Sequence, residues 1–166
     1  MNDLFPCLPV DCRILDLSAG NAAVWFGERP PGVVAIDRRN CSANVLADSR
    51  ALPFCDDAFD LGLFDPPHTN FGANGRMTKS YGHTTMPEIR ELIRQTAREA
   101  ARCIRRGGTM ALKWSDRDTA LTAVLGLMPA WRPLFGHGVV QRKRYSNQDR
   151  VSTTWWLLLL NEKPAK

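Results

Sequence analysis

The sequence has no CxxC pair, no complete GxGxxG motif and no long apolar run. Its five cysteines are scattered and odd in number, which argues against a disulfide framework and against a zinc site. The longest apolar run covers residues 155–160, whereas a membrane-spanning helix needs about 20 such residues. Residues 1–10 lack a cationic leader with an apolar core. We therefore expect a cytoplasmic protein that makes no membrane contact.

The composition is that of an ordinary globular protein, with 44% hydrophobic and 23% charged residues and no repeat or low-complexity tract. A length of 166 residues suits one α/β unit, so we expect residues 1–166 to form a single domain. Lys and Arg number 22 against 17 Asp and Glu, which gives a net charge of +5. This charge favours polyanionic partners but is a weak indication by itself.

Seven short apolar or β-branched runs predict strands. They cover residues 13–17, 33–36, 45–47, 59–64, 110–114, 134–140 and 152–160. We expect helices over residues 22–26, from Pro87 to Gly107 and from Ser115 or Asp116 to about Met128. Strands alternating with helices predict an α/β, Rossmann-like, mostly parallel seven-stranded sheet with an antiparallel last strand and helices on both faces.

The first predicted strand ends at Asp16 and is followed by a turn of small residues. A dinucleotide site would use a similar turn to hold a pyrophosphate, but it would carry more glycines than Gly20 alone. A cationic ligand without phosphate fits better, because Asp16 can attract an ammonium or sulfonium centre. Ser18, Ala19 and Gly20 would let the backbone approach such a ligand closely.

Two further carboxylates follow the second and third predicted strands. Asp37 is placed to accept both hydroxyl groups of a ribose, and Asp48 could accept from an adenine amino group. Each acid alone has an ordinary interpretation as a strand-end or cap residue. Ligands of doubly wound sheets bind beyond the carboxyl ends of the strands, so the three acids together favour a ligand site.

These motifs resemble the class I methyltransferases that use S-adenosylmethionine (AdoMet), and the resemblance extends over essentially the whole chain. Residues 46–65 are particularly similar to the third and fourth motifs of that family. The resemblance implies the family's fold and an AdoMet-dependent catalytic domain over residues 1–166. It also implies that Asp16 and the turn 18–20 hold the methionine part, that Asp37 holds the ribose, and that Asp48 with Ser49 holds the adenine. Ser18 and Ala22 depart from the family pattern, which often has glycine there.

Residues 65–68 form a DPPH turn that ends the fourth predicted strand. An exocyclic amino group of a nucleobase is a poor nucleophile, because its lone pair is delocalised into the ring. Asp65 and the carbonyl group of Pro66 could each accept one N–H bond from it, which would localise the lone pair and stabilise the developing positive charge. Pro67 would stiffen the turn, and His68 could stack on the base or hold its edge.

The DPPH turn resembles the (D/N/S)PP(Y/F/W) motif of amino-methyltransferases that modify adenine or cytosine in DNA or RNA. The aspartate version is most associated with adenine N6, and the histidine in place of the usual aromatic residue is a departure. The resemblance implies an N-methyltransferase with Asp65, Pro66, Pro67 and His68 as catalytic residues. No metal is needed for an in-line methyl transfer, and the spacing of the histidines suggests none.

Three alternatives remain open. Lys113, at the end of the fifth predicted strand, is similar to a lysine of RNA ribose 2′-O-methyltransferases that helps to activate a hydroxyl group. A methyltransferase acting on a small molecule would make the basic segments incidental. A binding module without catalysis is the third, and the DPP sequence alone could also be a simple turn.

Two segments are candidates for holding RNA or DNA. The loop over residues 69–86 carries Arg76, Lys79 and Tyr81 among glycines and could close over a flipped base. A basic turn over residues 142–150 is expected between the last two strands, with the candidate contacts Arg142, Lys143, Arg144 and Tyr145. Arginines recur every fourth residue from Arg90 to Arg106, and we interpret them as a solvated, salt-bridged helix face.

Overall fold

The computed structural model describes residues 11–26, 29–39, 41–69, 84–145 and 148–164, with the backbone alone for residues 142–145 and 148–150. In chain order the elements are β1 (Ile14–Asp16), the 3-10 helix η1 (Ala23–Trp25), β2 (Val34–Asp37), β3 (Val45–Leu46), β4 (Phe59–Phe64), α2 (Met86–Cys103), β5 (Ile104–Ser115), α3 (Leu121–Leu125), β6 (Trp131–Tyr145) and β7 (Gln148–Asn161). None of the helices in these ranges is long and apolar enough to cross a membrane.

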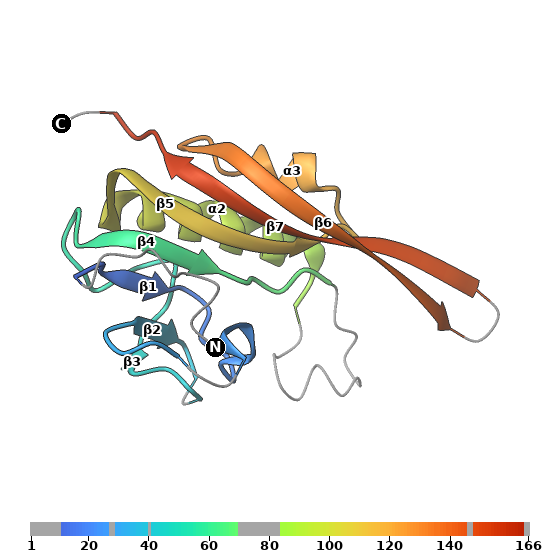
Figure 1. Cartoon of the computed structure of the whole chain (residues 1–166), viewed down its shortest axis with the longest axis horizontal. Helices are drawn as coiled ribbons and strands as arrows, with labels where there is room; N and C mark the ends of the chain where they lie inside the picture. Colours follow the sequence, from blue (N-terminus) through green and yellow to red (C-terminus); the bar gives the residue numbers. More distant parts are fainter. Residues whose placement is uncertain (1–10, 27–28, 40, 70–83, 146–147, 165–166) are drawn as a thin grey trace.

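The strands form one seven-stranded sheet in the order β3-β2-β1-β4-β5-β7-β6 (Figure 1). Neighbouring strands from β3 to β5 pair in parallel, whereas β7 pairs antiparallel with both β5 and β6. The predicted Rossmann-like sheet with an antiparallel last strand is therefore confirmed. The strand order reverses between β1 and β4, and this reversal is the position at which such sheets bind ligands.

The long helix α2 forms for reasons that are readable in its sequence. Thr85 is the N-cap and forms a capping box with Glu88, and Pro87 occupies the first turn. Its apolar face, which includes Ile89 and Ile93, is buried against the sheet. The helix ends at Cys103 and not at Gly107 as predicted, because Ile104 adopts an extended conformation and pairs with Phe59 of β4.

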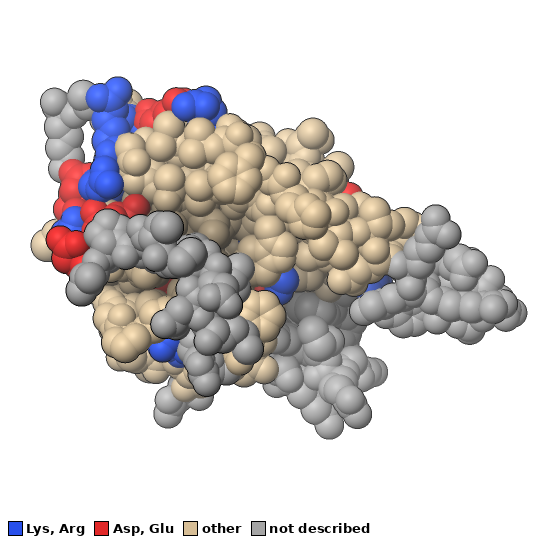
Figure 2. Space-filling view, in the orientation of Figure 1, with Lys and Arg blue, Asp and Glu red and all other residues tan. Residues whose placement is uncertain are grey.

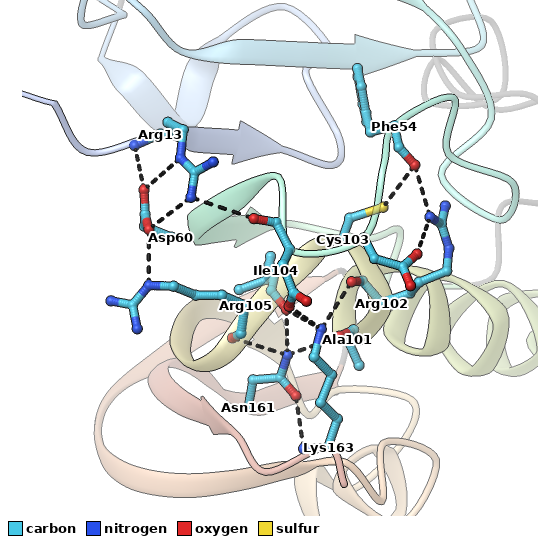
Figure 3. Close-up of polar contacts among 12 residues, drawn as sticks. Arg13, Phe54, Asp60, Ala101, Arg102, Cys103, Ile104, Arg105, Asn161 and Lys163 are labelled. Carbon is cyan, nitrogen blue, oxygen red and sulfur yellow. Dashed lines mark hydrogen bonds and ion pairs between the residues drawn. The ribbon is translucent and has the colours of Figure 1, made fainter. Parts of the chain in front are cut away.

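Two side chains at and just beyond the end of β7 reinforce the junction between α2 and β5 (Figure 3). Asn161 Nδ2 donates to the carbonyl oxygens of Ala101 at 3.0 Å and Ile104 at 2.8 Å. Lys163 Nζ donates to the carbonyl oxygens of Arg102 at 2.9 Å and Ile104 at 2.8 Å. Carbonyl groups at a helix end have no partner within the helix, so these bonds stabilise its early end.

Two other predicted helices are wrong in extent. After β1 the structure has the single 3-10 turn η1, since Ala22 and Phe26 adopt left-handed conformations with φ of 59° and 53° that stop an α-helix on either side. The helix expected from residue 115 or 116 is reduced to α3. Asp116 does not start it, because its carboxylate accepts from Thr153 N and Trp155 Nε1 of β7.

The sheet separates two clusters of buried apolar side chains. The larger cluster lies under α2 and α3 and includes Leu15, Ile93 and Val124. The smaller cluster, on the opposite face, includes Leu63 of β4 and Trp25 of η1. In the described residues the second face is thus covered by η1 and not by an α-helix.

Charged side chains gather at the edge of the sheet where β4 and β5 begin. There Asp60 accepts from Arg13 Nε at 3.1 Å and from Arg105 Nε at 2.9 Å, and these arginines hold the pKa of the Asp60 carboxyl well below its usual range (Figure 3). On the face in Figure 2 most charged side chains of the described residues lie at this end, and much of the remaining described surface in this view is uncharged. This edge is the one opposite the carboxyl ends of the parallel strands.

Candidate active site

The acids predicted to hold a ligand lie along the carboxyl edge of the sheet. Asp16 and Asp37 are the last residues of β1 and β2, and Asp65 follows β4 directly. Because β1 lies between β2 and β4, these three positions are neighbours across the sheet. Asp48 lies two residues beyond β3 and forms an isolated bridge with Ala51.

Asp16 faces inward. Its side chain is fully buried, Oδ1 accepts from Ser18 N at 3.0 Å, and Oδ2 accepts from Trp25 Nε1 at 2.7 Å. Burial raises the pKa of this carboxyl above its usual value, and the bond from Trp25 acts in the opposite direction. In this structure Asp16 therefore orients the turn that follows it, and the contact with a cationic ligand that is expected from the sequence stays a prediction.

Asp37 connects β2 with the small-residue turn after β1. Its Oδ2 accepts from Gly20 N at 3.1 Å, and its Oδ1 accepts from Arg39 N at 2.9 Å. The side chain keeps 15% of its surface exposed, so it faces the carboxyl edge. Gly20 has a φ of 48°, a left-handed conformation that disfavours most side chains. The contact with a ribose stays a prediction that this position allows.

Asp48 and Ser49 have partners within the chain. Asp48 Oδ2 pairs with Arg50 Nη2 at 2.6 Å, and this arginine lowers the pKa of the Asp48 carboxyl. The hydroxyl oxygen of Ser49 lies 2.8 Å from that of Thr96 on α2. An adenine amino group would have to share Asp48 with Arg50, so the predicted adenine contact requires either that sharing or a displaced arginine.

The DPPH turn is bonded to the turn after β1. The backbone N–H group of Asp65 donates to the hydroxyl oxygen of Ser18 at 2.8 Å. In the sequence these residues are 47 positions apart, and the parallel pairing of β1 with β4 brings them together. The glycine that the family often has in place of Ser18 has no side chain to accept this bond, so the serine directly links the predicted cofactor turn and the predicted amine-binding turn.

Lys113 reaches the same place from β5. Its Nζ lies 2.6 Å from Asp65 Oδ2, and the two side chains are 28% and 22% exposed. The register of β4 and β5 pairs Phe64 with Leu112, so the residues that follow them, Asp65 and Lys113, are also neighbours. Lys113 Nζ also lies 5.7 Å from the ring centroid of Trp156 on β7, within the range of a cation–π interaction.

His68 is held by the turn and by the core. Its Nδ1 lies 3.1 Å from the carbonyl oxygen of Pro66, and since a carbonyl oxygen only accepts, Nδ1 is the donor. The imidazole meets Trp114 edge-on, with ring centroids 5.9 Å apart. Burial lowers the pKa of His68, which favours a neutral ring. Stacking of this ring on a base remains a prediction. Pro67 lies between Pro66 and His68 in the same turn.

The structure describes only part of the segments predicted to contact the substrate. Arg76, Lys79 and Tyr81 lie outside the described residues. The segment 142–150 is not mainly a turn, since Arg142, Lys143, Arg144 and Tyr145 continue β6 and residues 148–150 begin β7. On α2, Arg94 pairs with Glu91 and Arg102 with Glu99, as expected of a salt-bridged face.

Three tryptophans support the site, although no motif in the sequence points to them. Trp25, Trp114 and Trp156 contact Asp16, His68 and Lys113, respectively. The sequence indicates them only through their number, since five tryptophans in 166 residues is high. The side chains that they contact depend on the fold. Within the described ranges no three His, Cys, Asp or Glu side chains form a metal-binding group.

Solved structures share this fold over nearly the whole chain, although no protein-family profile and no curated protein sequence matches it. A SAM-dependent methyltransferase from Methanosarcina mazei is similar over 95% of this chain and 96% of its own, with a TM-score of 0.61 and 11% identity. A candidate methyltransferase from Bacillus halodurans is similar over 98% and 96%, with a TM-score of 0.60 and 13% identity. The [4+2]-cyclase SpnF is similar over 90% and 74%, with a TM-score of 0.58 and 13% identity.

The fold is therefore the Rossmann-like fold of class I AdoMet-dependent methyltransferases. Such low identities establish the fold and not the reaction, and a cyclase among the similar structures illustrates that one fold serves different chemistry.

Proposed function

We propose that this protein is an AdoMet-dependent N-methyltransferase that acts on an exocyclic amino group of a nucleobase, adenine N6, in nucleic acid. The observation that carries the proposal is the 2.8 Å hydrogen bond from Asp65 N to Ser18 Oγ. It joins the turn suited to the cofactor with the turn suited to the amine. A methyl donor and a methyl acceptor must meet at one point, and these two turns are in contact.

The turn after β1 and the last residue of β2 fit AdoMet. The turn from Ser18 to Gly20 offers backbone without large side chains, and Asp37 offers an acceptor that is still partly exposed. Both lie at the carboxyl edge: the turn adjoins the reversal of strand order between β1 and β4, and Asp37 lies one strand further along. When bound, AdoMet supplies an electrophilic methyl group on a sulfonium centre.

The DPPH turn fits a planar amine. In this proposal Asp65 accepts one N–H bond of the amino group, and the carbonyl oxygen of Pro66 accepts the other. That oxygen already accepts from His68 Nδ1, and its second lone pair can serve the substrate. The carboxylate would offset the positive charge that develops on the nitrogen as the N–C bond forms and the bond between the methyl group and the sulfur of the donor breaks, after which the nitrogen releases one N–H proton to solvent.

In this arrangement Lys113 holds the carboxylate of Asp65 in place. Its ammonium group occupies Oδ2 of Asp65 and orients the carboxylate from the β5 side. A fixed carboxylate needs less reorganisation when charge develops on the substrate, and such preorganisation is a main source of catalysis. Lys113 is thus proposed as a positioning residue.

One observation favours a second candidate, ribose 2′-O-methylation. Lys113 is part of the same site, 2.6 Å from Asp65, and a lysine there could assist a hydroxyl nucleophile. The two candidates differ in the product: one methylates a base nitrogen and the other a ribose oxygen.

The test is to identify the product. The protein is incubated with labelled AdoMet and, separately, RNA, single-stranded DNA, duplex DNA and free adenosine, and the digested nucleosides are analysed by mass spectrometry. We expect N6-methyladenine from at least one polymer. A 2′-O-methylated nucleoside would support the second candidate, and no transfer to any substrate despite AdoMet binding would contradict both.

A further inference from the structure

The last two strands continue well past their neighbour. The final register pair of β5 is Ser115 with Thr154 of β7. Beyond it β6 and β7 pair only with each other, from Val140 with Thr153 to Tyr145 with Gln148. We call residues 140–145 and 148–153 the arm. At about 3.4 Å per residue its six register pairs extend the ribbon by roughly 20 Å, and Figure 1 shows it projecting from the body of the molecule.

The arm leaves the sheet on the side of the candidate site. β5 runs parallel to β4, so Ser115 lies at the same edge as Asp65 and the other strand ends. Asp116 attaches the base of the arm there: its carboxylate accepts from Thr153 N at 2.6 Å and from Trp155 Nε1 at 3.2 Å. Three residues before Asp116, Lys113 of β5 is the register partner of Trp156 on β7. The base of the arm is therefore contiguous with the site.

The arm is rich in positive charge. Its basic residues are Arg142, Lys143, Arg144 and Arg150, against the single acid Asp149. The register places Lys143 directly opposite Arg150. Like charges at opposed positions destabilise a strand pair, and a two-stranded ribbon is only marginally stable by itself. This arrangement becomes favourable when an anion lies against it.

The shape and charge of the arm suit a polynucleotide. The major groove of a duplex admits a two-stranded ribbon, and a single strand follows a basic surface through its phosphates. The exposed Val140 and Val151 add apolar surface between the charges. Basic residues often protect an exposed sheet edge from pairing with another chain. Here, however, the basic residues lie beyond the point where the ribbon leaves the sheet, and the base of that ribbon adjoins the site.

We propose that the arm binds the phosphodiester backbone of a polynucleotide and delivers it to the carboxyl edge, so that the substrate is a polymer and not a free nucleoside. The statement that this polymer accepts the methyl group rests on the proposed function, whereas binding by the arm does not. The experiment below measures binding separately for that reason.

The affinity of the full-length protein for labelled single-stranded RNA, single-stranded DNA and duplex DNA is measured by fluorescence anisotropy over a range of salt concentrations. The arm variant combines Arg142→Gln, Lys143→Gln and Arg150→Gln. Its control combines Arg90→Gln, Arg94→Gln and Arg98→Gln, which removes the same charge from the exposed face of α2. We expect the arm variant to lose at least about tenfold in affinity and to lower the salt slope by about two to three, with a small change in the control.

A single substitution distinguishes a loss of polynucleotide binding from a loss of folding. Lys143→Thr removes one of two like charges at register positions that oppose each other, so we expect a higher melting temperature together with weaker polynucleotide binding. Equal losses in the arm variant and its control would overturn the proposal, as would unchanged binding in Lys143→Thr. Binding of the wild type to phosphatidylserine vesicles but to no polynucleotide would also overturn it.

AdoMet affinity and methylation of the acceptor are measured on the same variants. Normal polynucleotide binding by the arm with no methyl transfer to any base would contradict the proposed function and leave the binding result intact. Methyl transfer to free adenosine as efficient as to the polymer, unaffected by the arm variant, would show that the arm does not deliver the substrate.

Discussion

Lys113 Nζ and Asp65 Oδ2 lie 2.6 Å apart at the ends of two neighbouring parallel strands. The pair brings together the residues on which the two candidate reactions depend. A base amine needs Asp65 as acceptor, and a ribose hydroxyl needs Lys113. Since the two groups share one site, substitution of each separates the two reactions.

Asp65→Ala should lower the rate of methyl transfer about 10²–10³-fold, because it removes the preorganised charge that offsets the cationic nitrogen. AdoMet affinity should be largely retained, since the side chain is not proposed to contact the cofactor. Asp65→Asn should be milder than Asp65→Ala if its amide oxygen still accepts. Single-turnover methylation and calorimetric AdoMet binding measure the two effects.

Lys113→Ala is the matched test of the second candidate. If Lys113 only positions Asp65, its loss should reduce the rate less than Asp65→Ala does. Full activity in Asp65→Ala, or a defect confined to Lys113→Ala, would contradict the amino-methyltransferase.

Asp37→Ala should weaken AdoMet binding, because each ribose hydroxyl loses a charged acceptor worth about 1.5–3 kcal/mol. Asp37 also accepts from Gly20 N, so a thermal melt must accompany the titration. Asp48→Ala is the comparison, since Arg50 already occupies that carboxylate. Equal affinity of wild type and Asp37→Ala would show that β2 does not supply the ribose contact.

Trp25→Phe should destabilise the fold by about 1–3 kcal/mol at neutral pH, because Asp16 would remain buried with one donor fewer. Loss of the indole bond should raise the pKa of Asp16 further. A raised folded-state pKa penalises folding above the unfolded value of about 3.9, so the difference from wild type should shrink as the pH falls toward it. Denaturant unfolding at several pH values measures this.

Trp131→Phe is the control for that prediction. Trp131 is buried too, and its Nε1 donates to the neutral carbonyl oxygen of Ala97 at 2.9 Å. Its cost should not change with pH. The same pH dependence in both variants would argue against an ionised Asp16.

Asp60→Asn should lower stability at neutral pH by about 1 kcal/mol or less, because the ion pairs with Arg13 and Arg105 are partly exposed. The pKa of Asp60 is depressed, so its contribution is present above about pH 4 and is lost as the pH falls. Wild type and variant should therefore converge in acid unfolding curves. Glu162→Gln, in the exposed pair with Arg132, should change stability by less than about 0.5 kcal/mol at any pH.

Local patterns predicted most of the sheet. The strand over residues 59–64 was predicted with the bounds that β4 has, because its buried run ends at two prolines. The helix after Gly20 was predicted wrongly, because left-handed residues at 22 and 26 are not visible in an apolar pattern. The end of α2 was misplaced because Asn161 and Lys163, about 60 residues away, satisfy its last carbonyl groups.

The positions of most strands, the acids at the strand ends and the DPPH turn are readable in the sequence, since they follow from residue types and spacing along the chain. The contacts of Asp16 with Trp25, of Ser18 with Asp65 and of Lys113 with Asp65 arise only in the assembled fold. Such contacts depend on the register between strands that are distant in sequence and on which side chains become buried. Neither is set by local residue preferences, so the geometry of the site emerges when the sheet assembles.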